Sequence, residues 1–373
     1  MNRTLMKKSK NKICLYGLGT LLEQNFERIV NMIGSKPDFV YDRNALFWGK
    51  RFKGVLCLNE PDFKKKLKNL HVIITLHYFD EIAEQLAQLG CRDITVVHYD
   101  KANSTASRLT PYQNIRDKLN ATETATLSRV SEWCYITGST RGIGLETAKF
   151  MAQNGVNLIL HGSGQNNSET LKSYFSQYDI ETIITECNFE SPSDIEQHCN
   201  WIENDAPDIK LAYCNAGVSL HKNEASFQHG TIDGWTKTFK VNVFSNAFLV
   251  RSLLKKMSVL DNGKIFFTSS AINKKTDELA YSCSKAALNK MVQEITQEPD
   301  YYKVEFCLID PGWVKSDMGG NDGIYHMQDL IPGMVFAAFT NYSCNGSWIT
   351  APNYRNMTLQ KAINRGLAIG DLH

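Results

Sequence analysis

A tyrosine and a lysine stand four residues apart in the stretch Tyr281-Ser-Cys-Ser-Lys285. On a helix this spacing places both side chains on one face. A phenol has an ordinary pKa of ~10, and a neighbouring cation lowers that pKa because it favours the phenolate. The pair is therefore suited to give a proton to a carbonyl oxygen or to take one from an alcohol. Such pairs also occur on surface helices without any catalytic role, so the surrounding residues decide between the two interpretations.

A glycine-rich loop provides a place for the cofactor that this chemistry would need. The apolar segment 133–137 predicts a strand, 145–153 predicts a helix, and Gly138-Ser-Thr-Arg-Gly142-Ile-Gly144 joins them. In such a loop one glycine makes a tight turn, one lets the backbone approach a pyrophosphate, and one lets helix and strand pack closely. The helix N-terminus adds unpaired N–H groups and a positive dipole end. We therefore expect dinucleotide contacts from Gly138, Ser139, Arg141, Gly142, Ile143 and Gly144.

The end of the next strand bears on the choice of cofactor. The strand expected over 156–160 runs into His161-Gly-Ser-Gly164, where no Asp or Glu stands to bind a ribose 2′-hydroxyl. Arg141, inside the glycine loop, is suited to pair with a 2′-phosphate instead. We therefore expect NADP(H) to be favoured over NAD(H). The alternative is that Arg141 is a solvated surface charge.

Four further motifs follow in order along the chain. One strand ends in Asn215-Ala-Gly217, an apolar helix carries Asn242, a buried strand ends in Ser269-Ser270, and a last strand runs into Asp310-Pro-Gly-Trp-Val-Lys-Ser316. With the glycine loop and the Tyr–Lys pair, this ordered set resembles the classical short-chain dehydrogenase/reductase family over residues from about 130 to 350. The resemblance implies the full fold of that family, a doubly wound parallel sheet, in the C-terminal part of the chain.

The resemblance also implies a role for each matching residue. Tyr281 would be the catalytic acid–base, and Lys285 would bind the nicotinamide ribose and lower the pKa of the tyrosine. Ser270 would hold the substrate oxygen, and Asn242 would anchor a water in a proton relay to Lys285. Further cofactor contacts would come from Asn188, Asn215, Ala216, Gly217, Pro311, Gly312 and Val314.

Two departures from the family pattern leave alternatives open. Asn188 stands near a position where the family often has an Asp that binds the adenine amine, and an amide replaces that carboxylate only in part. The spacing between Ser270 and Tyr281 is shorter than is common. Ser269 is therefore an alternative to Ser270.

The first hundred residues predict a separate small domain. Expected strands over 12–16, 38–42, 71–76 and 93–97 alternate with amphipathic helices, which is typical of a parallel sheet with helices on both faces. Gly17-Leu-Gly19 follows the first strand, and Asp42 ends the second, where a carboxylate can bind a ribose hydroxyl. The third glycine of a dinucleotide fingerprint is missing. The turn is therefore either a weak phosphate site or purely structural.

This segment resembles the small Rossmann-like domains of bacterial surface-polysaccharide and sugar-nucleotide enzymes. The similarity lies in Gly17-Leu-Gly19-Thr20, Asp42, Trp48-Gly49 with Gly54, and Glu84-Gln85-Leu86 with Gly90. Residues 101–129 are richer in Ser, Thr, Asn and Ala and lack strand signals, so we predict a linker there. The sequence thus predicts an α/β protein with two doubly wound parallel-sheet, Rossmann-like domains, over 1–100 and 130–373.

The charge balance, the cysteines and the apolar runs of the chain exclude several classes of partner and site. The chain of 373 residues has 41 Lys and Arg against 39 Asp and Glu, which gives no electrostatic case for nucleic acid. The ten cysteines include no Cys-x-x-Cys pair, so we expect no metal site and no disulfide framework. The basic N-terminus before an apolar run resembles a signal peptide, but no small-x-small cleavage site follows. No apolar run reaches the ~18 residues of a membrane span, and we expect a cytoplasmic protein.

Together these patterns predict a ketoreductase that acts on a small-molecule carbonyl or alcohol. The loops after Gly217 and Gly312 mix polar and aromatic groups, and with the N-terminal resemblance they point to a sugar or sugar nucleotide in bacterial surface polysaccharide biosynthesis. The alternatives are a nucleotide-sugar epimerase or dehydratase, which the glycine spacing disfavours, and a non-catalytic nucleotide-binding scaffold or sensor. Apolar positions on the two expected active-site helices predict a homodimer or homotetramer, and they are Phe244, Phe248, Leu288 and Met291.

Overall fold

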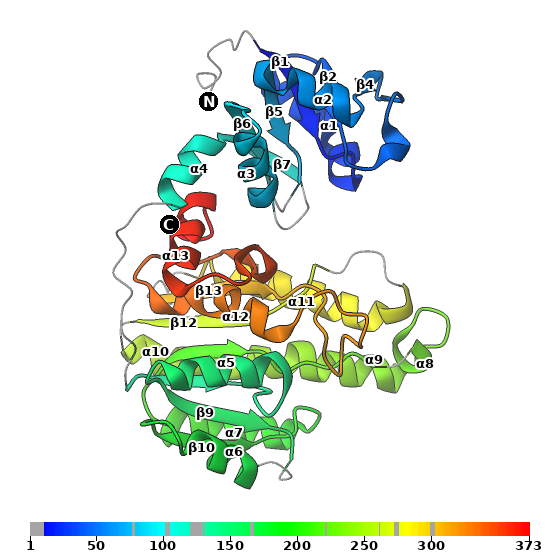
Figure 1. The fold of residues 1–373 in the computed structure, drawn as a ribbon. Helices are drawn as coiled ribbons and strands as arrows, with labels where there is room; N and C mark the ends of the chain where they lie inside the picture. The colour runs from blue at the N-terminus through cyan, green and yellow to red at the C-terminus, as the bar shows by residue number, and fades with distance from the viewer. Residues whose placement is uncertain are drawn as a thin grey trace. The chain divides into compact units, whose positions relative to one another are not determined.

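The chain divides into two compact units, Met1–Ala121 and Thr122–His373, and each is built on a seven-stranded sheet (Figure 1). The two doubly wound, mainly parallel sheets confirm the predicted fold class. The computed structural model describes residues 11–76, 79–100, 105–119, 129, 131–164, 168–220, 222–260, 262–271, 276–298 and 303–373.

The first unit arranges its strands in the order β3-β4-β2-β1-β5-β6-β7. The inner neighbours pair in parallel, and the short β3 and the longer β7 close the two edges as antiparallel strands. The strands are β1 (Lys12–Tyr16), β2 (Phe39–Tyr41), β3 (Arg51–Phe52), β4 (Val55–Cys57), β5 (Leu70–Ile74), β6 (Asp93–Asp100) and β7 (Thr105–Pro111). The helices are α1 (Thr20–Ile33), α2 (Glu60–Lys66), α3 (Asp80–Gln88) and α4 (Tyr112–Leu119).

Strand β7 and helix α4 fall inside the range 101–129 that the composition predicts to be a linker, and both belong to the first unit. The strand carries little apolar alternation because it is an edge strand. It is held by its ladder with β6 and by a bond of 2.7 Å from the Ala106 N–H to the side-chain oxygen of Asn25 on α1. Backbone and side-chain bonds of this kind leave no hydrophobic signal in a sequence.

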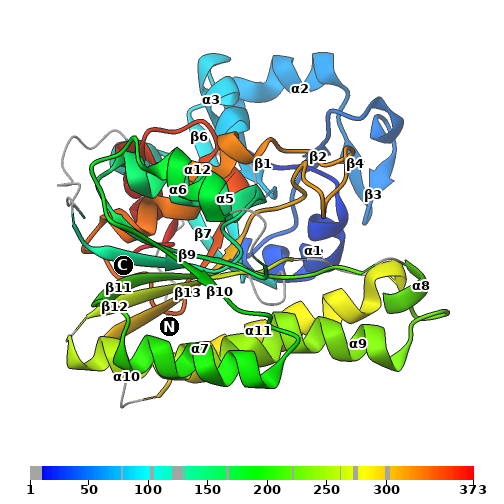
Figure 2. The same cartoon turned by 90° about the horizontal axis from the view of Figure 1, so that it is seen from below.

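The second unit arranges its strands in the order β10-β9-β8-β11-β12-β13-β14, and every neighbouring pair is parallel. Helices α5, α6 and α12 cover one face of this sheet, and α7, α10 and α11 cover the other (Figure 2). The strands are β8 (Trp133–Ile136), β9 (Asn157–Gly162), β10 (Thr182–Glu186), β11 (Ile209–Cys214), β12 (Gly263–Thr268), β13 (Val304–Asp310) and β14 (Trp348–Thr350). The helices are α5 (Gly142–Gln153), α6 (Ser168–Phe175), α7 (Pro192–Asn204), α8 (Lys222–Ala225), α9 (Ile232–Phe239), α10 (Ser245–Val259), α11 (Leu279–Ile295), α12 (Met327–Val335) and α13 (Leu359–Ile369).

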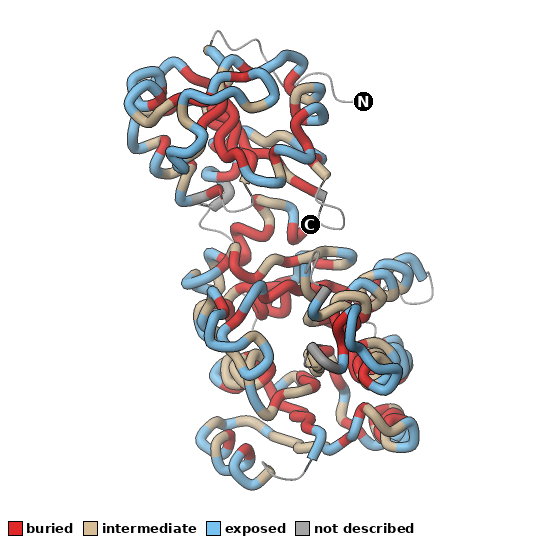
Figure 3. The backbone as a smooth tube through the Cα atoms, turned by 90° about the vertical axis from the view of Figure 1, so that its right-hand side faces the viewer, coloured by how far each residue is buried: buried red, intermediate tan, exposed pale blue. Residues whose placement is uncertain are grey.

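The five inner strands of the second unit, β8, β9, β11, β12 and β13, are almost entirely buried, and Figure 3 shows the buried segments of the chain in red. Leu158, Ile159 and Leu160 are consecutive in β9 and have no exposed surface. This continuous apolar run is what a parallel sheet between two helix layers requires. The chain crosses from one half of the sheet to the other between β8 and β11, and ligands of such sheets bind at the strand ends beside that switch point.

Within the described ranges, no helix combines the length and apolar character that crossing a membrane requires. The last helix, α13, packs against α12 and the 3₁₀ turn Phe336–Phe339 of the second unit. The C-terminal segment is therefore part of the core on the α12 side of the sheet.

Candidate active site

A cavity of about 600 Å³ lies at the carboxyl ends of β8, β9, β11, β12 and β13. The structure describes every residue that the sequence predicts for the site, and all but Ser139, Gly144 and Asn242 line this cavity. The predicted residues that line it are Gly138, Arg141, Gly142, Ile143, Asn188, Asn215, Ala216, Gly217, Ser270, Tyr281, Lys285, Pro311, Gly312 and Val314.

The three glycines of the loop before α5 do three different things. Gly138 turns the chain at φ +63°, and a Cβ there would lie 2.9 Å from the Cα of Ala216. Gly144 faces away from the cavity, where a Cβ would lie 2.3 Å from the carbonyl oxygen of Gly138. Gly142 has φ +60° and open space on its cavity side. The loop is therefore packed tightly underneath and left open toward the cavity.

His161, the next-to-last residue of β9, supports this loop. Its Nδ1 accepts a bond of 3.2 Å from the Gly138 N–H, so its Nε2, 3.1 Å from the Cys187 carbonyl oxygen, is the donor. Burial lowers the pKa of His161 to about 3, so the ring is neutral. The buried Ser139 hydroxyl accepts a bond of 2.9 Å from the His161 N–H. Ser139 therefore ties the loop to β9 and does not face the cavity.

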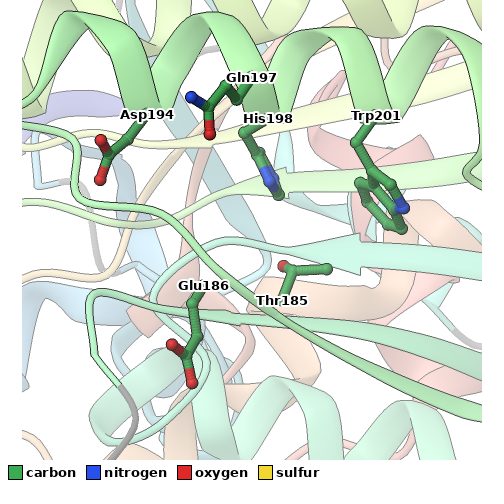
Figure 4. A pocket seen from close by; sticks show the side chains of 6 residues that line it. All are labelled: Thr185, Glu186, Asp194, Gln197, His198 and Trp201. Atoms are coloured by element: carbon green, nitrogen blue, oxygen red, sulfur yellow. The ribbon is translucent and has the colours of Figure 1, made fainter.

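A second cavity, of about 410 Å³, lies between β10 and α7 and contains no residue predicted from the sequence. Figure 4 shows Asp194, Gln197, His198 and Trp201 on α7 opposite Thr185 and Glu186 of β10. His198 Nε2 lies 2.8 Å from the Tyr135 hydroxyl, and burial lowers the pKa of this imidazole to about 4. The His198 ring stands 5.5 Å from Trp201 and 5.7 Å from His161. This aromatic column supports the end of β9 under the glycine loop.

Arg141 has a partner that the sequence does not indicate. Its Nη1 donates to Asp317 Oδ2 at 2.7 Å, and both side chains are about three-quarters exposed, at 75% and 77%. Asp317 lies in the loop that follows β13 and also lines the cavity. The expected partner of Arg141 was a 2′-phosphate, so the guanidinium faces the right cavity but is paired with a carboxylate of the chain.

Tyr281 and Lys285 lie on one face of α11 at the inner end of the cavity, as their spacing predicts. The ammonium of Lys285 is 5.6 Å from the centre of the tyrosine ring and donates a bond of 2.7 Å to the Thr268 carbonyl oxygen. Burial lowers the pKa of Lys285 to about 8. The lysine is therefore held at the end of β12, beside the tyrosine.

The pKa of Tyr281 is shifted in the direction opposite to the prediction. Burial raises it most, the negative charges of Asp310 and Glu278 raise it further, and a hydrogen bond with the Ser270 side chain lowers it. The prediction considered only the cation at i+4 and missed both the burial and the two carboxylates. The phenol consequently keeps its proton at neutral pH.

The two serines at the end of β12 have different partners. The Ser269 hydroxyl donates to the side-chain oxygen of Asn289 on α11, and its N–H donates to the Ile309 carbonyl oxygen at 2.7 Å. Ser270 instead bonds Tyr281. Of the two alternatives that the sequence leaves open, Ser270 is the one that meets the phenol.

Asn242 lies in a five-residue π-helical stretch, Lys240–Phe244, between α9 and α10. Its amide is fully buried, accepts a bond of 2.8 Å from the Val218 N–H and donates to the Val218 carbonyl at 2.9 Å and to the Ser284 hydroxyl at 2.9 Å. These bonds satisfy a polar group that would otherwise be costly to bury. Asn242 therefore fixes the segment after Gly217 against α11, and its side chain does not line the cavity.

The model of the short chain dehydrogenase family matches residues 132–323, which include the whole of this cavity's lining. The chain belongs to the short-chain dehydrogenase family. Members are NAD(P)-dependent oxidoreductases, and the fold, the glycine loop and the Tyr–Lys pair described above agree with that assignment. The match begins after the first unit, whose resemblance to sugar-nucleotide enzymes stays a prediction.

Two curated relatives of this short-chain dehydrogenase show how far the similarity reaches. A 3-oxoacyl-(acyl-carrier-protein) reductase of Rickettsia felis is 29% identical over 185 residues, which span 49% of this chain and 73% of the relative. A 2-dehydro-3-deoxy-D-gluconate 5-dehydrogenase of Pseudoalteromonas atlantica is 29% identical over 192 residues, 49% of this chain and 72% of the relative. The NADPH-bound carbonyl reductase from chicken fatty liver superposes with a TM-score of 0.52 at 19% identity, over 61% of this chain and 100% of the other.

The sequence assigns no role to several further residues of the dehydrogenase site, among them Thr268, Asp310, Glu278 and Asp317. Thr268 holds Lys285 through its carbonyl and donates from its hydroxyl to the Asn215 side chain at 3.1 Å. Asp310 is buried and accepts a bond of 2.9 Å from the Gly312 N–H, and Glu278 and Asp317 line the cavity. Asp310 ends a buried strand directly before Pro-Gly, which was the one usable signal for it. Among the described residues, no three His, Cys, Asp or Glu side chains gather in a way that could hold a metal ion.

The glycine turn of the first unit is closed by the unit's own side chains. Gly17 has φ +103°, and a Cβ there would lie 2.7 Å from the Leu76 side chain. One oxygen of Asp42 accepts the Leu18 N–H at 2.7 Å and the other accepts the Asn44 N–H at 2.8 Å. The carboxylate that the sequence suggests for a ribose is therefore used by the turn itself.

Proposed function

We propose that the second unit is an NADP(H)-dependent ketoreductase that interconverts a carbonyl and a secondary alcohol. The observation that carries this proposal is the meeting of Ser270, Tyr281 and Lys285 at the inner end of the cavity into which the glycine loop opens. Hydroxyl, phenol and ammonium groups together supply the donors that a carbonyl oxygen needs when it gains a proton. This is the Tyr-Lys-Ser part of the predicted constellation.

The residues around the cavity fit a nicotinamide dinucleotide. Gly142 leaves open space on the cavity side, at the start of α5, where a pyrophosphate would meet unpaired N–H groups. Arg141 stands at the outer rim, where a 2′-phosphate would meet it. A solved short-chain dehydrogenase from Burkholderia cenocepacia, with a TM-score of 0.52 at 19% identity over 60% of this chain and 97% of its own, is in complex with NADP. These points support NADP(H) over NAD(H).

When bound, the nicotinamide would supply or accept the hydride. The protonated Tyr281 donates its proton to the carbonyl oxygen, and Ser270, bonded to the phenol, holds that oxygen beside it. Lys285 places its ammonium next to the phenol and limits the cost of the charge that develops there. Asn242 keeps the segment after Gly217 in place through its bonds to Val218, and its role in a proton relay to Lys285 stays a prediction. The protonated phenol suits the step that donates a proton to the carbonyl oxygen.

The substrate we propose is a polar carbonyl compound, with a sugar or sugar nucleotide of bacterial surface polysaccharide biosynthesis as the specific candidate. Ser219 and Glu278 line the cavity and offer hydrogen bonds to hydroxyl groups, and Trp313 offers an apolar face. An epimerase or dehydratase, and a non-catalytic nucleotide sensor, are the alternatives. Phe244 and Phe248 are about half exposed, at 50% and 45%, and support the expected homo-oligomer, whereas Leu288 is fully buried in its own unit and is not available for contacts.

Titration of the full-length protein with NADPH and NADH, followed by nucleotide fluorescence, tests this function. We expect both the wild type and Tyr281→Phe to bind NADPH. Turnover of a carbonyl panel by the variant should fall by about 10³-fold, because the proton donor at the substrate oxygen is lost. Failure of the wild type to bind either nucleotide would refute the enzyme, and undiminished turnover by the variant would refute the role of Tyr281.

A further inference from the structure

The ion pair between Arg141 and Asp317 crosses the rim of the cofactor cavity. Arg141 precedes α5 as its N-cap residue, and Asp317 comes from the loop after β13, so the pair joins two segments that are far apart in the sequence. Only Nη1 of the guanidinium is used, at 2.7 Å. Both groups are mostly exposed, so the pair can open without unfolding anything around it.

The loop after β13 presents Asp317 on a turn that is bonded to itself. The Gly320 N–H donates to the Ser316 carbonyl at 2.8 Å, and the Gly319 N–H donates to the Ser316 hydroxyl at 3.0 Å. The Trp313 indole N–H donates to the Gly319 carbonyl at 2.7 Å. A Cβ on Gly319 would lie 2.0 Å from the Val314 carbonyl oxygen, which shows how tightly the turn is wound. Asp317 is thus held at the rim, and the longer arginine reaches it.

The charges around the cavity are unfavourable for an anionic cofactor. Among the lining side chains that the structure describes, two are basic and four are acidic: Arg141, Lys285, Glu190, Glu278, Asp310 and Asp317. Lys285 is buried beside Tyr281, and the nearby Glu190 is already paired with Lys237 at 2.8 Å. Of these groups, Arg141 is the cation placed at the exposed rim, and Asp317 is the carboxylate that neutralises it.

We propose that Asp317 is a cofactor-specificity residue whose carboxylate competes with the 2′-phosphate of NADP(H) for Arg141. The inference rests on the proposed function. A phosphate and a carboxylate on one guanidinium repel each other, and a phosphate binds best when it takes two N–H groups of the fork. Asp317 must therefore give way when NADP(H) binds, whereas NAD(H) has no group that contends for Arg141. The pair thereby limits the preference of this enzyme for NADP(H).

Fluorescence titrations of the full-length protein with NADPH and NADH test this. Asp317→Asn removes the charge and keeps the shape, and we expect it to lower the Kd for NADPH by about threefold, the usual range for an exposed pair. The Kd for NADH should stay unchanged. Asp322→Asn is the matched control, because Asp322 is exposed in the same loop but does not line the cavity. The gain of Asp317→Asn should shrink at about 0.5 M NaCl.

A double-mutant cycle of Asp317→Asn with Arg141→Met shows whether Asp317 acts through Arg141. If Asp317 acts through Arg141, Asp317→Asn changes nothing in the Arg141→Met background. Weaker NADPH binding by both Asp317→Asn and Asp317→Ser would overturn the inference, because Asp317 would then orient Arg141 for the phosphate. An equal gain for NADH, or the same gain from Asp322→Asn, would reduce the effect to general electrostatics. An unchanged Kd for NADPH would sink the inference alone, whereas a wild type that binds neither nucleotide would sink the proposed function with it.

Discussion

Both units join their first strand to their first helix through a glycine turn, but different groups pack against the two turns. In the first unit Leu76 packs against Gly17, and Asp42 accepts the N–H group that follows it. In the second unit the turn is packed from below by Ala216 and opens above at Gly142. The same strand-turn-helix arrangement is thus self-contained in one sheet and open to a ligand in the other.

The difference teaches that a glycine turn suits a phosphate only where the side of the turn that faces the ligand is left open. The second unit achieves this by moving its supporting contacts to the far side of the loop, onto His161 and Ser139. In the first unit the Asp42 carboxylate, at the end of the second strand, accepts the Leu18 N–H of the turn. The turn of the second unit is therefore open to an anionic ligand at Gly142, whereas the turn of the first unit already binds the Asp42 carboxylate.

The largest expected difference between the two turns comes from adding a methyl group to the first glycine of each. Gly138→Ala should weaken NADPH binding by roughly 50-fold, because a left-handed φ and a backbone contact of 2.9 Å together displace the loop. Gly17→Ala is the matched control, with a positive φ and a contact of 2.7 Å to Leu76. It should lower the stability of the first unit in chemical denaturation and leave NADPH binding intact. Loss of NADPH binding in Gly17→Ala would contradict the comparison.

The second-largest expected effect is a loss of carbonyl reduction at high pH, and it comes from Lys285 in the open site of the second unit. Burial lowers the pKa of Lys285 to about 8, so the ammonium is present below that pH and is lost above it. With the charge gone, kcat/KM for carbonyl reduction should fall by about tenfold per pH unit above pH 8. Tyr281 does not cause this limb, because its pKa is raised. The profile of Lys285→Arg should be lower but flat over the same range, and a wild-type plateau up to pH 10 would contradict the assignment.

The sequence predicts the elements around the site well because each is a local pattern. The apolar segment before Gly138 becomes β8, and the i, i+4 spacing of Tyr281 and Lys285 places them on one face of α11. The motifs assemble because parallel strands bring their carboxyl ends to one edge. Local spacing and the geometry of the sheet therefore explain why the predicted residues meet in one cavity.

What the sequence does not predict depends on partners that are distant along the chain. Arg141 and Asp317 are 176 residues apart, and nothing near either one indicates the pair. Whether Ser269 or Ser270 meets Tyr281 depends on Asn289, one turn of helix beyond the lysine. The raised pKa of Tyr281 comes from burial and from Asp310, which a helix pattern does not reveal. Such features are set by packing, so they become visible only in the folded chain.

The smallest effect tests whether the first unit binds the same cofactor through Asp42. Asp42→Ala removes the acceptor for the Leu18 and Asn44 N–H groups and should cost the first unit about 1 kcal/mol in chemical denaturation. Calorimetric titration with NADPH should give one site per chain in both wild type and variant, with the same Kd. A second site that disappears in Asp42→Ala would mean that the carboxylate can leave its backbone partners for a ribose. The two turns would then differ only in their affinity for NADPH. The first unit would bind it more weakly, because the bonds of Asp42 to the Leu18 and Asn44 N–H groups must break before a ribose can take their place.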